Sequence, residues 1–120
     1  MSRPTTLKGE TYKSPTPLGP LFMTINHTDA GIPYEVFLRI GKSGSDVTAL
    51  AESHGRLISL VLASGGTLDK VVDQLKGIGG NNPIFENGSR ILSFPDAVAK
   101  TLETYLANHS RPSQPSPTPS

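Results

Sequence analysis

The residues best suited to chemistry lie in one short stretch, GKSGSD at residues 41–46, where a predicted strand gives way to a predicted helix. A phosphate-binding Walker A loop needs a glycine five positions before the Gly-Lys-Ser triplet. That position is Val36, so the motif is absent. What remains is a glycine-rich turn before a helix, where free backbone N–H groups and the helix dipole favour an anion and Lys42 could assist.

The same turn has a simpler interpretation. Ser45 or Asp46 would cap the helix, and the glycines would only make a tight turn. The residue types favour this interpretation over an anion or nucleotide site. If an anion or a docking partner does bind, the candidate surface combines backbone donors with cationic side chains. It consists of Gly41, Lys42, Gly44, Ser45 and Arg56.

A second polar cluster, Ser93-Phe94-Pro95-Asp96, has the spacing of a helix capping box. Proline suits the first helical turn, and an acidic residue there is favoured by the helix dipole. A catalytic Asp96 would need a neighbouring base or metal ion, and no adjacent residue supplies one. Capping therefore accounts for the whole cluster, and we assign no catalytic residue to it.

The three histidines, His27, His54 and His109, do not have the spacing of a metal-ligand pair on a helix or hairpin. His54 lies on an apolar helix stripe and is expected to be half-buried and hydrogen-bonded. Its neighbour Gly55 costs a helix about 1 kcal/mol relative to alanine, which suggests close packing against a strand or a partner. No G-x-S-x-G nucleophile elbow occurs, so the sequence predicts neither a metal site nor an independent hydrolase.

The elements that position these residues follow from the hydrophobic pattern. Short β-prone runs separated by turn residues predict antiparallel strands near 10–15, 20–27 and 34–40. From residue 46 the apolar residues recur with the helical period. The predicted buried stripe of this helix consists of Val47, Leu50, Ala51, His54, Leu57, Ile58, Val61 and Leu62.

Within the strands, alternation places Leu21, Met23 and Ile25 on the inward face. In the third strand the inward set consists of Val36, Leu38 and Ile40. Four aromatic residues could share one face of the sheet, which we expect the helices to cover. They are Tyr12, Phe22, Tyr34 and Phe37.

The second half of the chain predicts two more helices and a hairpin. Thr67 is a good N-cap for a short helix with the stripe Leu68, Val71, Val72 and Leu75. A hairpin would turn at Asn87-Gly88. A last helix begins after Ser93, and its buried stripe consists of Val98, Leu102, Tyr105 and Leu106. The prediction is an α+β fold: a small antiparallel meander, two packed helices, a short hairpin and a C-terminal helix.

Composition sets the remaining limits. The 120 residues suit one domain, with an N-terminal arm at 1–9, the folded part at 10–109 and a disordered proline- and serine-rich tail at 110–120. The absence of cysteine excludes disulfides, thiolate metal sites and thiol chemistry. No apolar run approaches the roughly 18 residues of a membrane span, so we expect a cytoplasmic protein. A net charge of +1 and 6% aromatic residues argue against nucleic acid as a partner.

Three stretches resemble a known family when taken together: TINHTDAGIPYEVFLRIGKSGSD, ALAESHGRLISL and PDAVAKTLE. With their surroundings, from about residue 3 to 107, they are similar to the TSCPD domain at the C-terminus of adenosylcobalamin-dependent (class II) ribonucleotide reductases. The family is named for a Thr-Ser-Cys-Pro-Asp motif. This chain retains Ser93, Pro95 and Asp96 of that motif and has Phe94 in place of the cysteine.

The resemblance implies an accessory or C-terminal module that docks on the catalytic chain of a class II ribonucleotide reductase and acts in assembly or modulation, without turnover of its own. The module itself would bind no cofactor. Adenosylcobalamin would belong to the parent enzyme, and a nucleotide is a further candidate ligand. In many such reductases a cysteine-rich tail carries electrons. This chain contains no cysteine, so it cannot have that role. The alternative is a free-standing module that binds a nucleotide, RNA or another protein.

Overall fold

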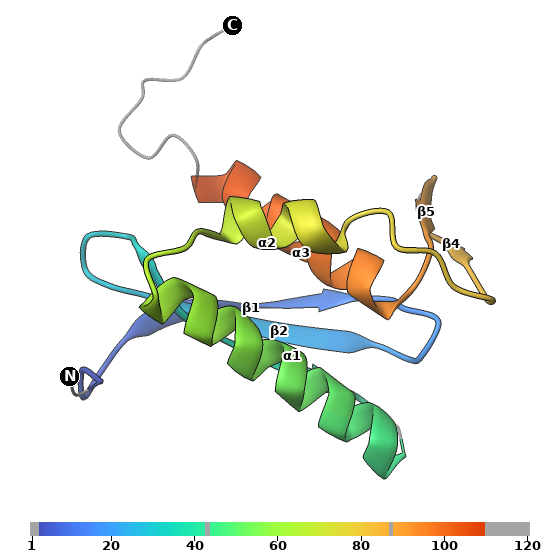
Figure 1. Ribbon diagram of the computed structural model, residues 1–120, viewed down its shortest axis with the longest axis horizontal. Coiled ribbons are helices and arrows are strands. Elements are labelled where there is room, and N and C mark those ends of the chain that lie inside the picture. Colours follow the sequence, from blue (N-terminus) through green and yellow to red (C-terminus); the bar gives the residue numbers. More distant parts are fainter. Residues whose placement is uncertain (1–2, 43, 87, 110–120) are drawn as a thin grey trace, which may run out of the picture.

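The computed structural model describes residues 3–42, 44–86 and 88–109. Its elements in chain order are β1 (Lys8–Ser14), β2 (Leu21–His27), β3 (Pro33–Ile40), α1 (Ser45–Ala63), α2 (Leu68–Leu75), β4 (Ile84–Glu86), β5 (Ser89–Ile91) and α3 (Phe94–His109) (Figure 1). The predicted α+β class and order of elements are confirmed. The predicted disordered tail, with Ser43 and Asn87 of the predicted turns, lies outside the described residues.

The first three strands form an antiparallel sheet in the order β1-β2-β3. Tyr12, Met23 and Leu38 lie opposite one another in its register, so one face of the sheet carries the large apolar side chains. Leu21, Met23 and Ile25 are fully excluded from solvent on this face. The prediction that they face inward is confirmed, and their burial provides the main hydrophobic contribution of the sheet.

Helix α1 packs along β3, one of the two edge strands of this sheet. Unpaired N–H and C=O groups of an edge strand need partners. The Ser59 hydroxyl accepts a hydrogen bond from the Val36 N–H at 2.9 Å and donates one to the Val36 carbonyl at 3.1 Å. A Cβ atom on Gly55 would lie 3.1 Å from the nitrogen of Leu38 and 3.2 Å from the Val36 oxygen. The close packing expected at Gly55 is therefore with a strand of the same chain.

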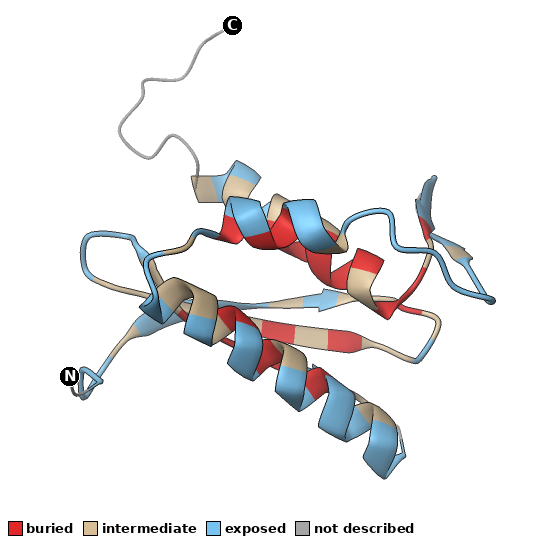
Figure 2. Ribbon diagram, in the orientation of Figure 1, coloured by how far each residue is buried: buried red, intermediate tan, exposed pale blue. Residues whose placement is uncertain are grey.

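The buried stripe of α1 is narrower than the sequence predicts. Only Ala51, Gly55 and Ile58 are buried on this helix, and Figure 2 shows its other sides largely exposed. The prediction is wrong for Leu50 and Leu57, which are 52% and 60% exposed. The reason is that β3 contacts a narrow strip of small residues, while α2 and α3 pack mainly against each other.

The remaining elements close the core from the other side. On α3, Val98, Leu102 and Tyr105 are buried, as predicted, and Leu106 is partly buried. The short helix α2 packs on α3, and its buried side chains are Leu68, Val71 and Val72. The hydroxyl of Thr67 accepts a hydrogen bond from the backbone N–H of Lys70, which confirms the predicted N-cap. The hairpin β4–β5 leads directly into the start of α3 (Figure 1).

Candidate functional site

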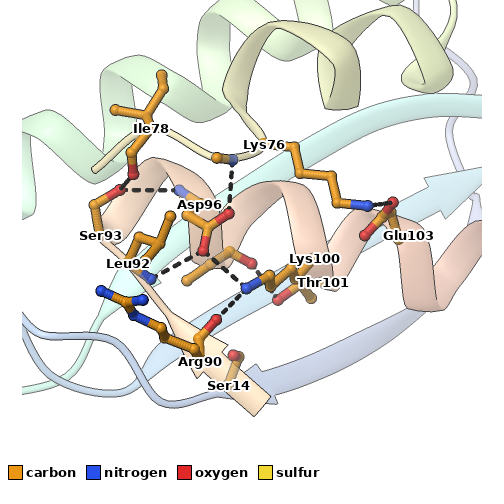
Figure 3. A network of polar contacts seen from close by, with 12 residues as sticks. Ser14, Lys76, Ile78, Arg90, Leu92, Ser93, Asp96, Lys100, Thr101 and Glu103 are labelled. Atoms are coloured by element: carbon orange, nitrogen blue, oxygen red, sulfur yellow. Dashed lines mark hydrogen bonds and ion pairs between the residues drawn. The ribbon is translucent and has the colours of Figure 1, made fainter. Parts of the chain in front are cut away.

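The start of α3 is the most polar buried region of the described chain, and Ser93 is its first component (Figure 3). Its hydroxyl oxygen accepts a hydrogen bond from the backbone N–H of Asp96 at 3.2 Å. The same hydroxyl donates to the carbonyl of Ile78 at 2.6 Å. Ser93 therefore caps α3, as predicted, and also fixes the loop that follows α2.

Asp96 departs from the predicted capping box. Its carboxylate does not reach back to the N-cap residue but accepts hydrogen bonds from the N–H groups of Gly77 and Leu92, both at 2.9 Å (Figure 3). Lys100 lies 3.0 Å from the same carboxylate and also donates to the carbonyl of Arg90. Local spacing cannot reveal these bonds because Gly77 is brought to Asp96 by the tertiary packing of α2 on α3.

The charge of Asp96 is stabilised despite its burial. Removal from water raises the pKa of a carboxyl group, but the two backbone N–H donors and Lys100 outweigh that effect, so the pKa of Asp96 lies below its ordinary value. The side chain is only 1% exposed. A substrate cannot reach it, and Ser93 and Asp96 therefore form a structural junction between α3, β5 and the loop after α2, while Pro95 lies between them in the first turn of α3.

Phe94 occupies the middle of this junction and is buried. Its ring meets that of His54 edge-on, with ring centroids 5.1 Å apart. The Nδ1 atom of His54 lies 2.9 Å from the carbonyl oxygen of Leu50, one helical turn earlier. His54 is thus half-buried and hydrogen-bonded, as predicted, and it connects α1 to α3.

The strand–helix turn at residues 41–46 is much more open. The N–H of Gly41 donates to the Pro20 carbonyl at 2.9 Å, and Lys42 is exposed in the left-handed backbone region with φ +53°. Gly44 is the N-cap of α1, and no described side chain caps this end of the helix. Ser45 and Asp46 are the first residues inside the helix, so the prediction that one of them caps it is wrong.

The structure does not gather the predicted anion or docking surface into one place. Gly41, Lys42, Gly44 and Ser45 lie together at the start of α1. Arg56 is eleven residues along the helix, about 16 Å away at 1.5 Å per residue. Its guanidinium contacts Glu52 at 2.7 Å. Any anion bound at the turn would be held without Arg56, and such a site stays a prediction.

An apolar cleft between α1 and α2 is the region that sequence reasoning missed. Its volume is about 430 Å³. The lining comes from His54, Leu57, Ile58, Val61, Lys70, Val71, Asp73, Gln74 and Leu75. Leu57 projects into it while remaining 60% exposed, and Leu60 beside it is 59% exposed. The sequence held one clue, because the apolar residues of α1 span more of the helix than one strand can cover.

The described residues contain no group of three His, Cys, Asp or Glu side chains placed to hold a metal ion. His109 lies 2.9 Å from a carboxylate oxygen of Glu10, and its ring is 6.1 Å from that of His27. None of the helices described is long and apolar enough to cross a bilayer.

Comparison with known families gives a match over most of the chain. A model of the TSCPD domain matches residues 2–106, which include the α3 junction, the strand–helix turn and the cleft. This domain is known from ribonucleotide reductases. Comparison with curated proteins found no significant match, and comparison with solved structures found none.

Proposed function

We propose that this chain, which belongs to the TSCPD domain family, is a non-catalytic accessory module of an adenosylcobalamin-dependent ribonucleotide reductase. It would dock on the catalytic chain and act in assembly or in modulating access of nucleotides. Membership of the family supports the connection with ribonucleotide reduction. The requirement for adenosylcobalamin and the identity of the partner chain belong to the proposal.

The observation that carries docking is the apolar surface of α1 beside the α1–α2 cleft. Leu57 and Leu60 are each more than half exposed, and Leu50 extends the same side of the helix toward its start. Adjoining exposed apolar side chains are typical of protein-binding sites. A partner that inserts apolar side chains into the cleft would remove these leucines from water and gain about 25 cal/mol for each Å² buried.

A module without turnover agrees with the way the chain uses its polar residues. The buried side chains of Ser93 and Asp96 form hydrogen bonds with backbone groups, and Asp96 also forms an ion pair with Lys100. The cleft contains His54 as its one histidine, with Nδ1 at the Leu50 carbonyl. The chain contains no cysteine. We therefore assign adenosylcobalamin and the radical chemistry to the catalytic chain.

The test is to mix this protein with the catalytic chain of a class II reductase from the same organism, lacking any copy of the domain. Complex formation is measured by light scattering and calorimetry, and turnover is measured in the same samples. We expect a complex with altered turnover. Leu57→Asp should weaken association at least tenfold, about 1.4 kcal/mol. The reason is that the partner would cover the cleft and remove the new aspartate charge from water.

Ile32→Asp is the matched control. Ile32 is 62% exposed, nearly the same as Leu57, but lies in the turn between β2 and β3. This variant should bind the catalytic chain as the unmodified protein does. Absence of a complex at high micromolar concentration would refute the accessory role. An equal loss of affinity in both variants would refute the assignment of the cleft as the docking site.

A further inference from the structure

The face of the sheet opposite the helices carries a polar and aromatic surface. Alternation along each strand puts nine residues there, in three rows across the sheet: Gly9, Asn26 and Glu35; Thr11, Thr24 and Phe37; Lys13, Phe22 and Arg39. We call this surface the open face. Phe37, at the β3 end of the middle row, is 55% exposed, so the prediction that the helices cover it is wrong. Tyr12 lies on the other face, opposite Met23.

One row of the open face places two cations around an aromatic ring. The guanidinium carbon of Arg39 lies 4.4 Å from the centroid of the Phe22 ring, and the Nζ of Lys13 lies 5.7 Å from it. Both distances are within the range of cation–π attraction. The strand register fixes this arrangement, because Lys13, Phe22 and Arg39 come from three adjacent strands. Lys13 and Arg39 are themselves exposed, so their charges face the solvent.

The neighbouring rows add hydroxyl groups and neutralise the only carboxylate among the nine residues. The hydroxyl oxygens of Thr11 and Thr24 are 2.9 Å apart beside Phe37. Both carboxylate oxygens of Glu35 accept from Arg3, at 2.9 and 2.8 Å, and Asn26 donates to one of them at 2.6 Å. The hydrogen bond from Arg3 is the main reason that the pKa of Glu35 is lowered. Among the nine residues and Arg3, Lys13 and Arg39 are therefore left as positive charges that are not paired with Glu35.

These features match the chemistry of a single-stranded nucleic acid better than that of an apolar protein surface. Bases stack on exposed aromatic rings and on guanidinium planes, and phosphates bind lysine and arginine. Modules that recognise RNA on an open antiparallel sheet stack two or three bases on aromatic side chains of adjacent strands. An apolar partner would instead have to desolvate Lys13 and Arg39 without offering them a counter-charge.

We propose that the open face binds a short single-stranded oligonucleotide. One base stacks on the ring of Phe37, and the next base stacks on the guanidinium of Arg39, which is held against the Phe22 ring. Lys13 contacts the phosphate backbone. The net charge of +1 argued against such a ligand, but this value is a sum over the whole chain and does not describe the charge of one face. The nine residues of the open face together with Arg3 contain three cations, Arg3, Lys13 and Arg39, and one carboxylate, Glu35, which is paired with Arg3. This site is separate from the α1–α2 cleft and does not depend on the accessory function.

Fluorescence anisotropy with labelled ten-nucleotide RNA and DNA, in uridine or thymidine and adenine versions, tests the proposal. At low salt we expect micromolar affinity for single strands and at least tenfold weaker binding of a duplex. Contact with about two phosphates predicts a loss of about 25-fold in affinity for a tenfold rise in salt. The RNA and DNA arms show which backbone the face prefers. Phe37→Ala should weaken binding about tenfold, and Arg39→Gln should weaken it and flatten the salt dependence.

Two variants serve as controls. Phe85→Ala removes a phenylalanine that is even more exposed than Phe37, at 73%, from strand β4 outside the open face. Leu57→Asp alters the cleft, so this variant should bind oligonucleotides as the unmodified protein does, although it should bind the catalytic chain more weakly. The proposal is refuted if the folded protein binds no single strand at about millimolar concentration, or if Phe37→Ala binds as well as Phe85→Ala. It is also refuted if Phe37→Ala abolishes binding of the catalytic chain instead, since the face would then be a protein interface.

Discussion

Helix α3 begins inside the protein, whereas helix α1 begins at its surface. At the start of α3, Ser93 and Asp96 bind backbone groups from three segments, and their side chains are excluded from water. At the start of α1, Gly44 is the N-cap, and Ser45 and Asp46 are exposed. The two starts have similar residues, a serine and an aspartate near the first turn. Whether such residues stabilise the fold depends on which backbone groups the tertiary structure brings to them.

The two helices are also held at different points. Helix α3 is fixed at its first turn, while α1 is fixed at its middle, where Gly55 and Ser59 contact the edge of β3. A helix attached along one narrow strip leaves its flanks free. On α1 those flanks carry Leu57 and Leu60, which form the candidate docking surface. The closed junction is therefore structural, and the loosely covered helix is available for function.

The largest effect should come from Asp96→Ala. Its loss leaves the part-buried hydrogen bonds from the N–H groups of Gly77 and Leu92 without their acceptor and removes the charged partner of Lys100. We expect the free energy of unfolding to fall by about 3 kcal/mol, measured by urea denaturation. Asp46→Ala, the matched change at the start of α1, should cost no more than about 0.5 kcal/mol. Equal losses of stability in the two alanine variants would show that the two helix starts do not differ. Asp96→Asn removes the charge but keeps a side-chain oxygen acceptor, so its loss of stability should be smaller than that of Asp96→Ala.

Acid should weaken the junction selectively. Because the folded pKa of Asp96 lies below its ordinary value, the unfolded chain binds a proton at higher pH than the native protein does. The stabilisation is present above the unfolded pKa, about 4, and is lost as the pH falls through the folded pKa. The free energy of unfolding should decrease between about pH 5 and 2, and less steeply in Asp96→Asn. The pKa values of Glu10 and Glu35 are also lowered, so these two groups should account for the pH dependence of stability that remains in the variant. If stability depended on pH equally steeply in Asp96→Asn and in the unmodified protein, the prediction would be contradicted.

A smaller contrast is expected between the two serines. Ser93→Ala removes the cap of α3 and the bond to Ile78, and should lower the free energy of unfolding by about 1.5 kcal/mol. Ser45→Ala should be neutral or raise it by a few tenths of a kcal/mol, because alanine is the better helix former. Thermal and urea denaturation of both variants measure the difference. A cost at Ser45 comparable with that at Ser93 would mean that the Ser45 side chain stabilises the start of α1 and would contradict the prediction.

The smallest effect should come from placing a capping side chain at Gly44, since no described side chain caps the start of α1. The backbone of Gly44, at φ −72° and ψ 171°, suits any residue, and a Cβ there would meet nothing within 4 Å. Gly44→Ser adds a hydroxyl acceptor for the first-turn N–H groups and restricts the unfolded chain. We expect a gain of about 0.5 kcal/mol in the free energy of unfolding. A loss of stability would indicate that the open turn is needed as it is.

Local patterns in the sequence determined much of this protein. Alternation placed Leu21, Met23 and Ile25 on the buried face, and the helical period located all three helices. The Thr67 cap and the Ser93 cap were predictable because each bond spans only three residues. The packing of Gly55 was predictable because glycine inside a helix is costly unless another element comes close.

Tertiary structure decided where the surfaces lie. Periodicity identifies apolar residues on α1 but not how wide a neighbour covers them, so Leu50 and Leu57 were wrongly predicted to be buried. The bonds of Asp96 to Gly77 and the stacking of Arg39 on Phe22 join residues 17 to 19 positions apart. Local sequence shows only that a residue carries a hydrogen-bond donor, an acceptor or an aromatic ring. Their partners are chosen by the packing of whole helices and strands, because contact energies act through space and not along the chain.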